Sequence, residues 1–110
     1  MRHSALLKRG NTLYVFWTQI GDTPERILVS TIDLKGDWMR WRDSEPAEVR
    51  RAQQSWEGSN LPVEPSRRGA ITRPVNQLRD PAVYEEGDQV YLLYAIAGEQ
   101  GITIGRLTGL

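Results

Sequence analysis

The sequence has no cysteine and a single histidine among its 110 residues. Without cysteine the chain can form neither a disulfide scaffold nor a thiolate metal site, and one histidine cannot build a histidine-rich zinc centre. The sequence also lacks a phosphate-binding loop and the glycine fingerprint of dinucleotide-binding proteins. A serine triad would need His3 as its base, and no nucleophile elbow is present. These absences exclude the commonest metal, nucleotide and triad chemistries.

The chain has no excess of charge and no long apolar run. Its 14 basic and 14 acidic residues cancel, so nothing favours nucleic acid or an anionic membrane as a partner. The longest apolar run, Val90 to Ala97, is eight residues, whereas a membrane helix needs about 20. The start of the chain does not resemble a signal peptide. We therefore expect a globular protein that is cytoplasmic, or secreted as part of a longer protein.

An internal repeat is the strongest positive feature of the sequence. The segment Ala5 to Gly21 aligns without a gap with Ala82 to Gly98, at a constant offset of 77 residues. The matched positions include two turn glycines and a tyrosine: Gly10 with Gly87, Gly21 with Gly98, and Tyr14 with Tyr91. After a two-residue difference in the next turn, Ile27 matches Ile102. Two similar units of this kind indicate stacked repeats.

Apolar runs bounded by turn residues predict seven strands. Four strands are expected in a blade-like unit 1–49, at residues 4–8, 12–19, 26–34 and 38–42, and three more in a unit 78–110. The uniformly apolar run from Val90 to Ala97 predicts a strand covered on both faces. Residues 45–57 also allow a short helix that starts at Pro46. Residues 50–77 form the connection, which is rich in proline from residue 55 onward and long for a compact domain.

The opening of the second unit resembles a known family. Leu78-Arg79-Asp80-Pro81, followed by Tyr91-Leu92-Leu93-Tyr94 and Gly98-Glu99, is similar to blade openings in the five-bladed β-propeller glycosidases. These are the arabinanase, invertase and levansucrase relatives, glycoside hydrolase families 43, 32 and 68. The resemblance implies an all-β chain of two four-stranded antiparallel propeller-type blades, the second incomplete. It implies a single partial domain, residues 1–110, at the C-terminal end of such a propeller.

The same resemblance implies a function. The chain would be part of a glycoside-hydrolase-like protein and would contribute to the mouth that receives the carbohydrate. The family's catalytic aspartates and glutamate belong to earlier blades, so none maps onto a residue here, and the chain alone is expected to be inactive. The alternative is a non-catalytic carbohydrate-binding or scaffold module. It would cover its open apolar faces by self-association, because soluble monomers rarely expose large apolar patches.

The repeat alignment places His3 and Asp80 at the same blade position, where both would face a central channel. By resemblance, His3 could help to hold a calcium ion there; the alternative is a flexible residue near the chain start. Asp80 is a candidate for binding sugar, or else a structural aspartate that bonds turn amides of its own blade. Pro81 predicts an extended backbone at Asp80.

Further candidates surround the expected mouth. Arg79 would pair with Asp80 or with a neighbouring blade. The turn after the second strand of each unit should lie on the mouth side, and the alternative for its charged residues is an ordinary solvated rim. These residues are Asp22, Glu25, Arg26 and Glu99, with Glu25 and Arg26 close enough to form an ion pair.

The connection supplies its own candidates. Trp56 could stack on a sugar or fill a gap between blades, and Glu57 is a carboxylate candidate beside it. Arg67 and Arg68 could contact a polyol or a carboxylate, or be solvated at the surface.

Overall fold

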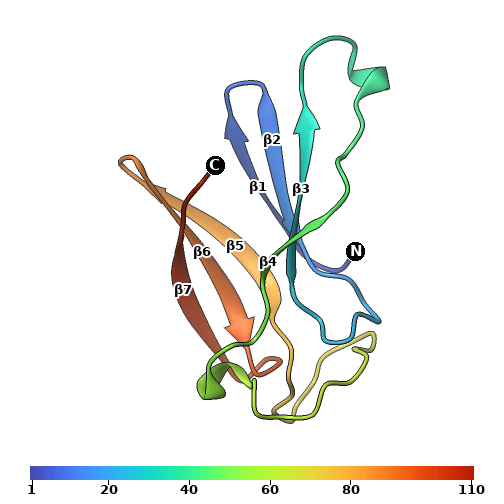
Figure 1. Ribbon diagram of the computed structural model, residues 1–110, viewed down its shortest axis with the longest axis vertical. Helices are drawn as coiled ribbons and strands as arrows, with labels where there is room; N and C mark the ends of the chain where they lie inside the picture. Colours follow the sequence, from blue (N-terminus) through green and yellow to red (C-terminus); the bar gives the residue numbers. More distant parts are fainter.

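The computed structural model describes all 110 residues and is all-β (Figure 1). Seven strands form two antiparallel sheets. The first sheet has the order β1 (Ser4–Arg9), β2 (Thr12–Trp17), β3 (Ile27–Asp33), β4 (Ala47–Arg50), and the second the order β5 (Arg79–Glu86), β6 (Gln89–Ile96), β7 (Gly101–Leu107). Two single-turn 3-10 helices, η1 (Trp38–Arg40) and η2 (Ser55–Glu57), complete the regular structure. Neither helix is long enough to cross a membrane.

The two sheets repeat one hydrogen-bonding register, as the sequence repeat predicts. Ala5 pairs with Phe16 in the first sheet, and 77 residues further on Ala82 pairs with Leu93. All five aligned pairs between the first two strands of each sheet correspond in this way. The third strands also correspond, once the two-residue difference in the preceding turn is allowed for: Phe16 pairs with Val29, and Leu93 pairs with Ile104. The repeat is therefore a structural repeat, confirmed strand by strand.

The turns repeat as well. Gly10 and Gly87 have φ of 56° and 60°, and Gly21 and Gly98 have φ of 92° and 82°. These left-handed conformations suit glycine, which has no Cβ to clash with the backbone. The matched glycines therefore lie in matched turns of the two units.

The outer part of the first unit differs from the prediction. Residues 38–42 do not form a strand, because Asp37 accepts a hydrogen bond from the Met39 amide and starts the 3-10 turn η1. The fourth strand is Ala47–Arg50, which pairs with β3. The short helix considered for residues 45–57 is also wrong, apart from the single turn η2. The open edge of β3 offers backbone partners that outweigh the local helical preference.

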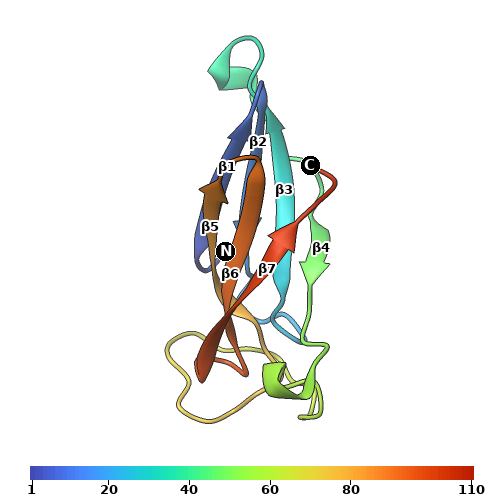
Figure 2. The ribbon, with the colours of Figure 1, turned by 90° about the vertical axis from the view of Figure 1, so that its left-hand side faces the viewer.

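The two sheets pack face to face, with their first strands closest together (Figures 1 and 2). The core between them takes three residues from the strands of the first sheet, and four from the second sheet and the residue before it. These are Leu7, Phe16 and Ile27, with Leu78, Val90, Leu92 and Tyr94. An ion pair of 3.0 Å between Arg9 and Glu85 joins β1 and β5 near their ends. The strands β1 and β5 thus form the inner edges of two stacked sheets.

Only one face of each sheet is covered within this chain. On β6, alternate residues such as Leu92 are buried, while Tyr91 and Leu93 between them are partly exposed. Exposed Tyr84, Ile102 and Ile104 extend this open face, and Ile102 is 77% exposed. Within this chain the expected cover of β6 is therefore confirmed for one face only.

The first sheet has a corresponding open face. Its exposed side carries apolar residues of β1, β2 and β3, including Leu6, which is exposed. A hollow of about 330 Å³ lies on this side, lined mainly by apolar side chains, among them Val15, Trp17, Ile32 and Trp41. Each sheet thus presents an apolar surface that the rest of the chain covers only in part.

The long connection crosses the end of both sheets at which β1 and β5 begin (Figure 1). Beyond Arg50, the last residue of β4, it contains no strand, as predicted, and backbone hydrogen bonds hold it in place. Val75 donates to the Ala97 carbonyl, Ala97 donates to Glu57, and Gly98 donates to Gln77. The connection therefore fixes the turn between β6 and β7 and closes this end of the core.

Gly58 provides a test of this packing. It has φ of 100°, and a Cβ at this position would lie 2.5 Å from the Val75 carbonyl oxygen. Gly36 has φ of 79° with open space around it. We expect Gly36→Ala to cost about 1 kcal/mol for the left-handed backbone, and Gly58→Ala to cost at least twice as much. Urea unfolding measures both losses; equal losses would contradict the close approach of Gly58 to Val75.

Candidate functional site

Charged residues gather at the end of the two sheets where β1 and β5 begin, which we call the polar end. The turns β2–β3 and β6–β7 and the connection meet the strand starts there, at the bottom of Figure 1. Ser66 of the connection donates its backbone N–H to Asp22 of the first turn, and Glu99 of the second turn accepts the Ile71 amide. The polar end therefore brings together segments that are far apart in the sequence.

His3 and Asp80 meet at the inner edge of the polar end. His3 Nδ1 lies 2.8 Å from Asp80 Oδ1, and both side chains are partly accessible to solvent. His3 lies two residues before Ala5, where the first copy of the repeat begins, and Asp80 lies two residues before Ala82, where the second copy begins. The structure thus brings together the two residues that the alignment assigned to one blade position. Their contact becomes an ion pair when the imidazole is protonated.

The backbone at Asp80 is left-handed, with φ of 55°, so the extended conformation expected before Pro81 is wrong. The cause is a bulge in the pairing of β5 with β6 between Arg79 and Ala82. Bulges re-aim side chains near strand ends. Asp80 accepts no hydrogen bond from a backbone amide, so the predicted role as a structural aspartate in its own turn is also wrong.

The residues present do not by themselves fit a calcium ion. Calcium takes six to eight oxygen ligands, and His3 and Asp80 together supply one carboxylate and one imidazole. No group of three or more histidine, aspartate or glutamate side chains gathers as a possible metal site in the chain. A calcium role for His3 would need ligands from outside this chain.

Arg79 is buried at the centre of the polar end and does not pair with Asp80. Its Nε and Nη2 donate to Gln77 Oε1 at 2.9 and 2.6 Å, and its Nη1 donates to the Gly69 carbonyl at 3.0 Å. Carboxylate oxygens of Glu25 and Glu99 lie 3.7 Å from Arg79. Arg79 therefore joins the connection to the turns of both sheets.

Glu25 is fully buried, although its place in a turn suggested a solvated rim. Its partner is Arg2, whose Nη2 donates to Glu25 Oε1 at 3.0 Å. The predicted ion pair between Glu25 and Arg26 is wrong: Arg26 lies 3.4 Å from Asp22 and 3.4 Å from Glu48 instead. Arg26 therefore faces the outer strand β4 and lies apart from the His3–Asp80 contact.

Glu57 is buried, and its carboxylate is already occupied. Arg50 donates to both carboxylate oxygens, at 3.2 and 2.7 Å, and the Tyr94 hydroxyl donates to Oε2 at 2.9 Å. The backbone amides of Gln53 and Gln54 donate to Oε1. In this structure Glu57 anchors the connection to β6. Trp56 beside it is 53% exposed, so it does not fill a gap between the sheets.

This network shifts two pKa values. Burial favours the neutral form of Glu57, but hydrogen bonds from Arg50 and from the amides of Gln54 and Gln53 outweigh it and lower the pKa of Glu57. Burial, together with the hydrogen bond to Glu57, raises the pKa of Tyr94 to about 12. At neutral pH the network therefore holds a charged carboxylate and a neutral phenol.

Comparisons with known proteins show that the chain is similar to one segment of a longer protein. No family model matches it, and no solved structure matches it. "Uncharacterized protein R118" of Acanthamoeba polyphaga mimivirus is 45% identical over 108 residues, which is 97% of this chain and 30% of that protein. The chain therefore spans less than a third of the length of this relative, and both sheets lie within the similar segment.

The pKa of Tyr94 predicts sensitivity to alkali. The folded state holds the phenol proton more tightly than the unfolded chain, whose tyrosine pKa is 10.0. The resulting stabilisation is complete below pH 10 and is lost as the pH rises through 12. We expect the stability advantage of the native chain over Tyr94→Phe to shrink by about 2 kcal/mol between pH 9 and pH 12. Urea midpoints measure this, and a constant advantage would contradict the buried Tyr94–Glu57 bond.

Proposed function

We propose that this chain forms two neighbouring blades of a larger β-propeller of the glycoside hydrolase type, and that its polar end contributes to a carbohydrate-binding mouth. The observation that carries the proposal is the packing of the two repeated sheets through unlike faces, with their first strands together at the inner edge. In a propeller, each blade packs in this way on the next, around a hub formed by the first strands.

The faces that pack are not equivalent in the repeat. The first sheet buries Leu7, Phe16 and Ile27, whose counterparts in the second sheet are Tyr84, Leu93 and Ile102 on its open face. The second sheet buries Val90, Leu92 and Tyr94, whose counterparts in the first sheet are Leu13, Val15 and Trp17, directed to its open face by strand alternation. The two open faces are thus complementary, and further sheets could add on either side by the same packing. Such head-to-tail contacts close into rings when the rotation allows it.

The length of the mimivirus relative agrees with this proposal. Both units of the chain match within 30% of that protein, so a protein of that size has room for further units. We propose that such units, in a longer chain, cover the two open faces.

The polar end supports a binding role more than a catalytic one. Glycoside hydrolysis requires two carboxyl groups, about 5 to 10 Å apart, on either side of the bond to be cleaved. At the inner edge, Asp80 is an accessible carboxylate. Elsewhere at the polar end, Glu25 and Glu57 are buried in ion pairs. The proposal therefore assigns the catalytic pair to other blades and sugar contact to the surface around His3 and Asp80.

The complementary open faces also favour a second candidate, a non-catalytic carbohydrate-binding or scaffold module built from copies of this chain. In that case light scattering should detect a stable closed oligomer, and titration of that oligomer with glycans should detect binding. Aggregation, or a poorly folded monomer, favours the first candidate.

Oligosaccharide titrations test the proposed mouth. Arabino-, xylo- and fructo-oligosaccharides are added to the isotope-labelled chain, and its amide resonances are followed. We expect one class to shift resonances around His3 and Asp80 without turnover of the matching aryl glycoside. Asp80→Asn should weaken this binding about tenfold, since it removes a charged hydrogen-bond acceptor. The matched variant Asp88→Asn, in the turn at the other end of the sheet, should bind normally.

Two results would contradict the proposal. Robust turnover by this chain would show that its own residues form the catalytic pair. Failure of every sugar class to bind, with the fold intact, would remove the carbohydrate role.

A further inference from the structure

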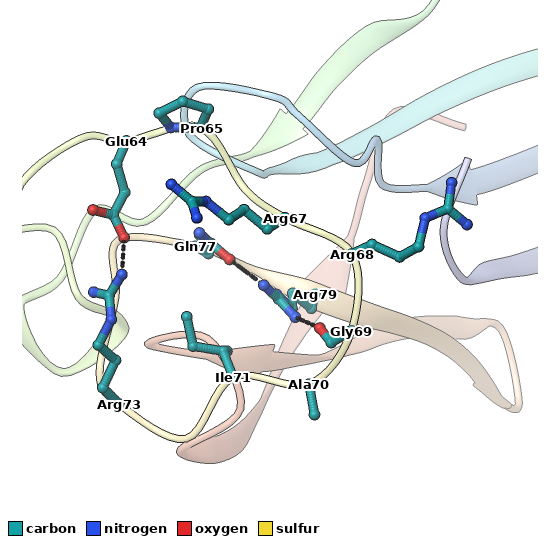
Figure 3. A pocket seen from close by; sticks show the side chains of 10 residues that line it. All are labelled: Glu64, Pro65, Arg67, Arg68, Gly69, Ala70, Ile71, Arg73, Gln77 and Arg79. Carbon is teal, nitrogen blue, oxygen red and sulfur yellow. Dashed lines mark hydrogen bonds and ion pairs between the residues drawn. The ribbon is translucent and has the colours of Figure 1, made fainter.

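A second polar feature of the polar end lies under the loop of residues 64–73 (Figure 3). The loop encloses a hollow of about 400 Å³, which is within the range of small-molecule sites. Four arginines and one glutamate line it, and only two of the ten lining residues are hydrophobic. Its size and charge suit a small, polar, negatively charged group.

The floor of the hollow consists of two buried side chains with unused donors. Arg79 and Gln77 are each 1% exposed. Arg79 uses three of its N–H groups on Gln77 Oε1 and Gly69 O, and a guanidinium has five. Gln77 Oε1 accepts from Arg79, while the Gln77 amide nitrogen has no acceptor in the chain and faces Arg67 (Figure 3). Both residues therefore have donors without a hydrogen-bond partner in the chain, and the Arg79 charge is partly balanced by the Glu25 and Glu99 carboxylates at 3.7 Å.

The walls add one free cation. The Arg67 guanidinium points over the floor and makes no hydrogen bond or ion pair, whereas Arg68 points away (Figure 3). The backbone carbonyl of Arg67 accepts a hydrogen bond of 2.6 Å from Arg2, which fixes this part of the loop. Across the hollow, Arg73 is neutralised by Glu64 at 2.6 Å. Arg67 is thus the unpaired charge that faces the buried donors.

We infer that this hollow binds the carboxylate of an acidic sugar. The inference rests on the proposed function, because it names the substrate class for the same polar end. A planar carboxylate matches the fork of a guanidinium and can take two parallel hydrogen bonds. Arg67 from above, and Arg79 with Gln77 from below, supply these donors, and the Glu64 carboxylate can accept from sugar hydroxyls. The Gly69 carbonyl at the edge of the hollow accepts hydrogen bonds from Arg79 and from Arg2, the residue before His3, so a uronic acid unit here would belong to the same polar end as the proposed mouth.

The test compares galacturonate, galactose and inorganic phosphate by titration of the labelled chain. We expect galacturonate to shift the resonances of Gln77 and Gly69, and to bind at least tenfold more tightly than galactose. Arg67→Gln should weaken the binding about tenfold, because it removes a charged hydrogen-bond donor. The control Arg40→Gln removes the same charge from η1, at the far end of the first sheet, and should bind normally.

The other outcomes separate this inference from the proposed function. Equal binding of galactose and galacturonate would overturn the acidic-sugar assignment and leave the carbohydrate role in place. Binding of phosphate alone, sensitive to Arg67→Gln, would overturn the assignment in favour of a general anion site. If Arg67→Gln and Arg40→Gln weaken the binding of galacturonate equally, the attraction comes only from the net charge of the chain, and the hollow is not the binding site.

Discussion

The structure depends on the apolar contact between two unlike faces of a repeated sheet. Leu7, Phe16 and Ile27 on one side meet Leu78 and Leu92 on the other, and all are buried. Burial of each such side chain contributes on the order of 2 kcal/mol, so no polar contact in the molecule compares with their sum. This packing brings β1 and β5 together, and that proximity in turn creates the contact between His3 and Asp80.

The polar end follows from the same packing. Two sheets that stack by their first strands place the starts of those strands, and the turns after their second strands, at a common end. The connection must cross that end to reach the second unit. Its backbone groups and those of the turns satisfy one another, and Arg79 and Glu57 hold it from within. Buried charges of this kind are stable only when they are paired or hydrogen-bonded, which explains why most glutamates at this end are structural.

Much of the fold could be predicted from the sequence because the repeat is explicit. Matched glycines mark matched turns, and these turns fix the ends of the strands and the register in which they pair. The same alignment places His3 and Asp80 at equivalent positions, where the structure brings them into contact. The fourth strand could not be predicted, since the capping of η1 by Asp37 and the pairing of residues 47–50 with β3 depend on contacts that the local pattern does not contain.

The site was harder to predict. Glu25 and Glu57 look like ordinary polar residues in the sequence, and their burial depends on Arg2, Arg50 and Tyr94, up to 37 residues away. The left-handed backbone of Asp80 depends on a bulge in the pairing with β6. The arginine hollow depends on how the connection folds over Gln77. One signal was present: Arg67 and Arg68 stand beside a glycine within a long connection.

The central claim, that the two open faces are complementary, can be tested most directly by disulfide trapping. The chain has no cysteine, so one chain with Ile104→Cys and another with Val15→Cys each carry a single thiol. Their repeat counterparts, Val29 and Leu92, both contribute to the core contact. The two variants are mixed and mildly oxidised. We predict that disulfides between the two different variants form in clear excess over disulfides between two copies of the same variant. Equal or greater linkage of identical variants would show symmetric pairing of like faces, and would contradict the account.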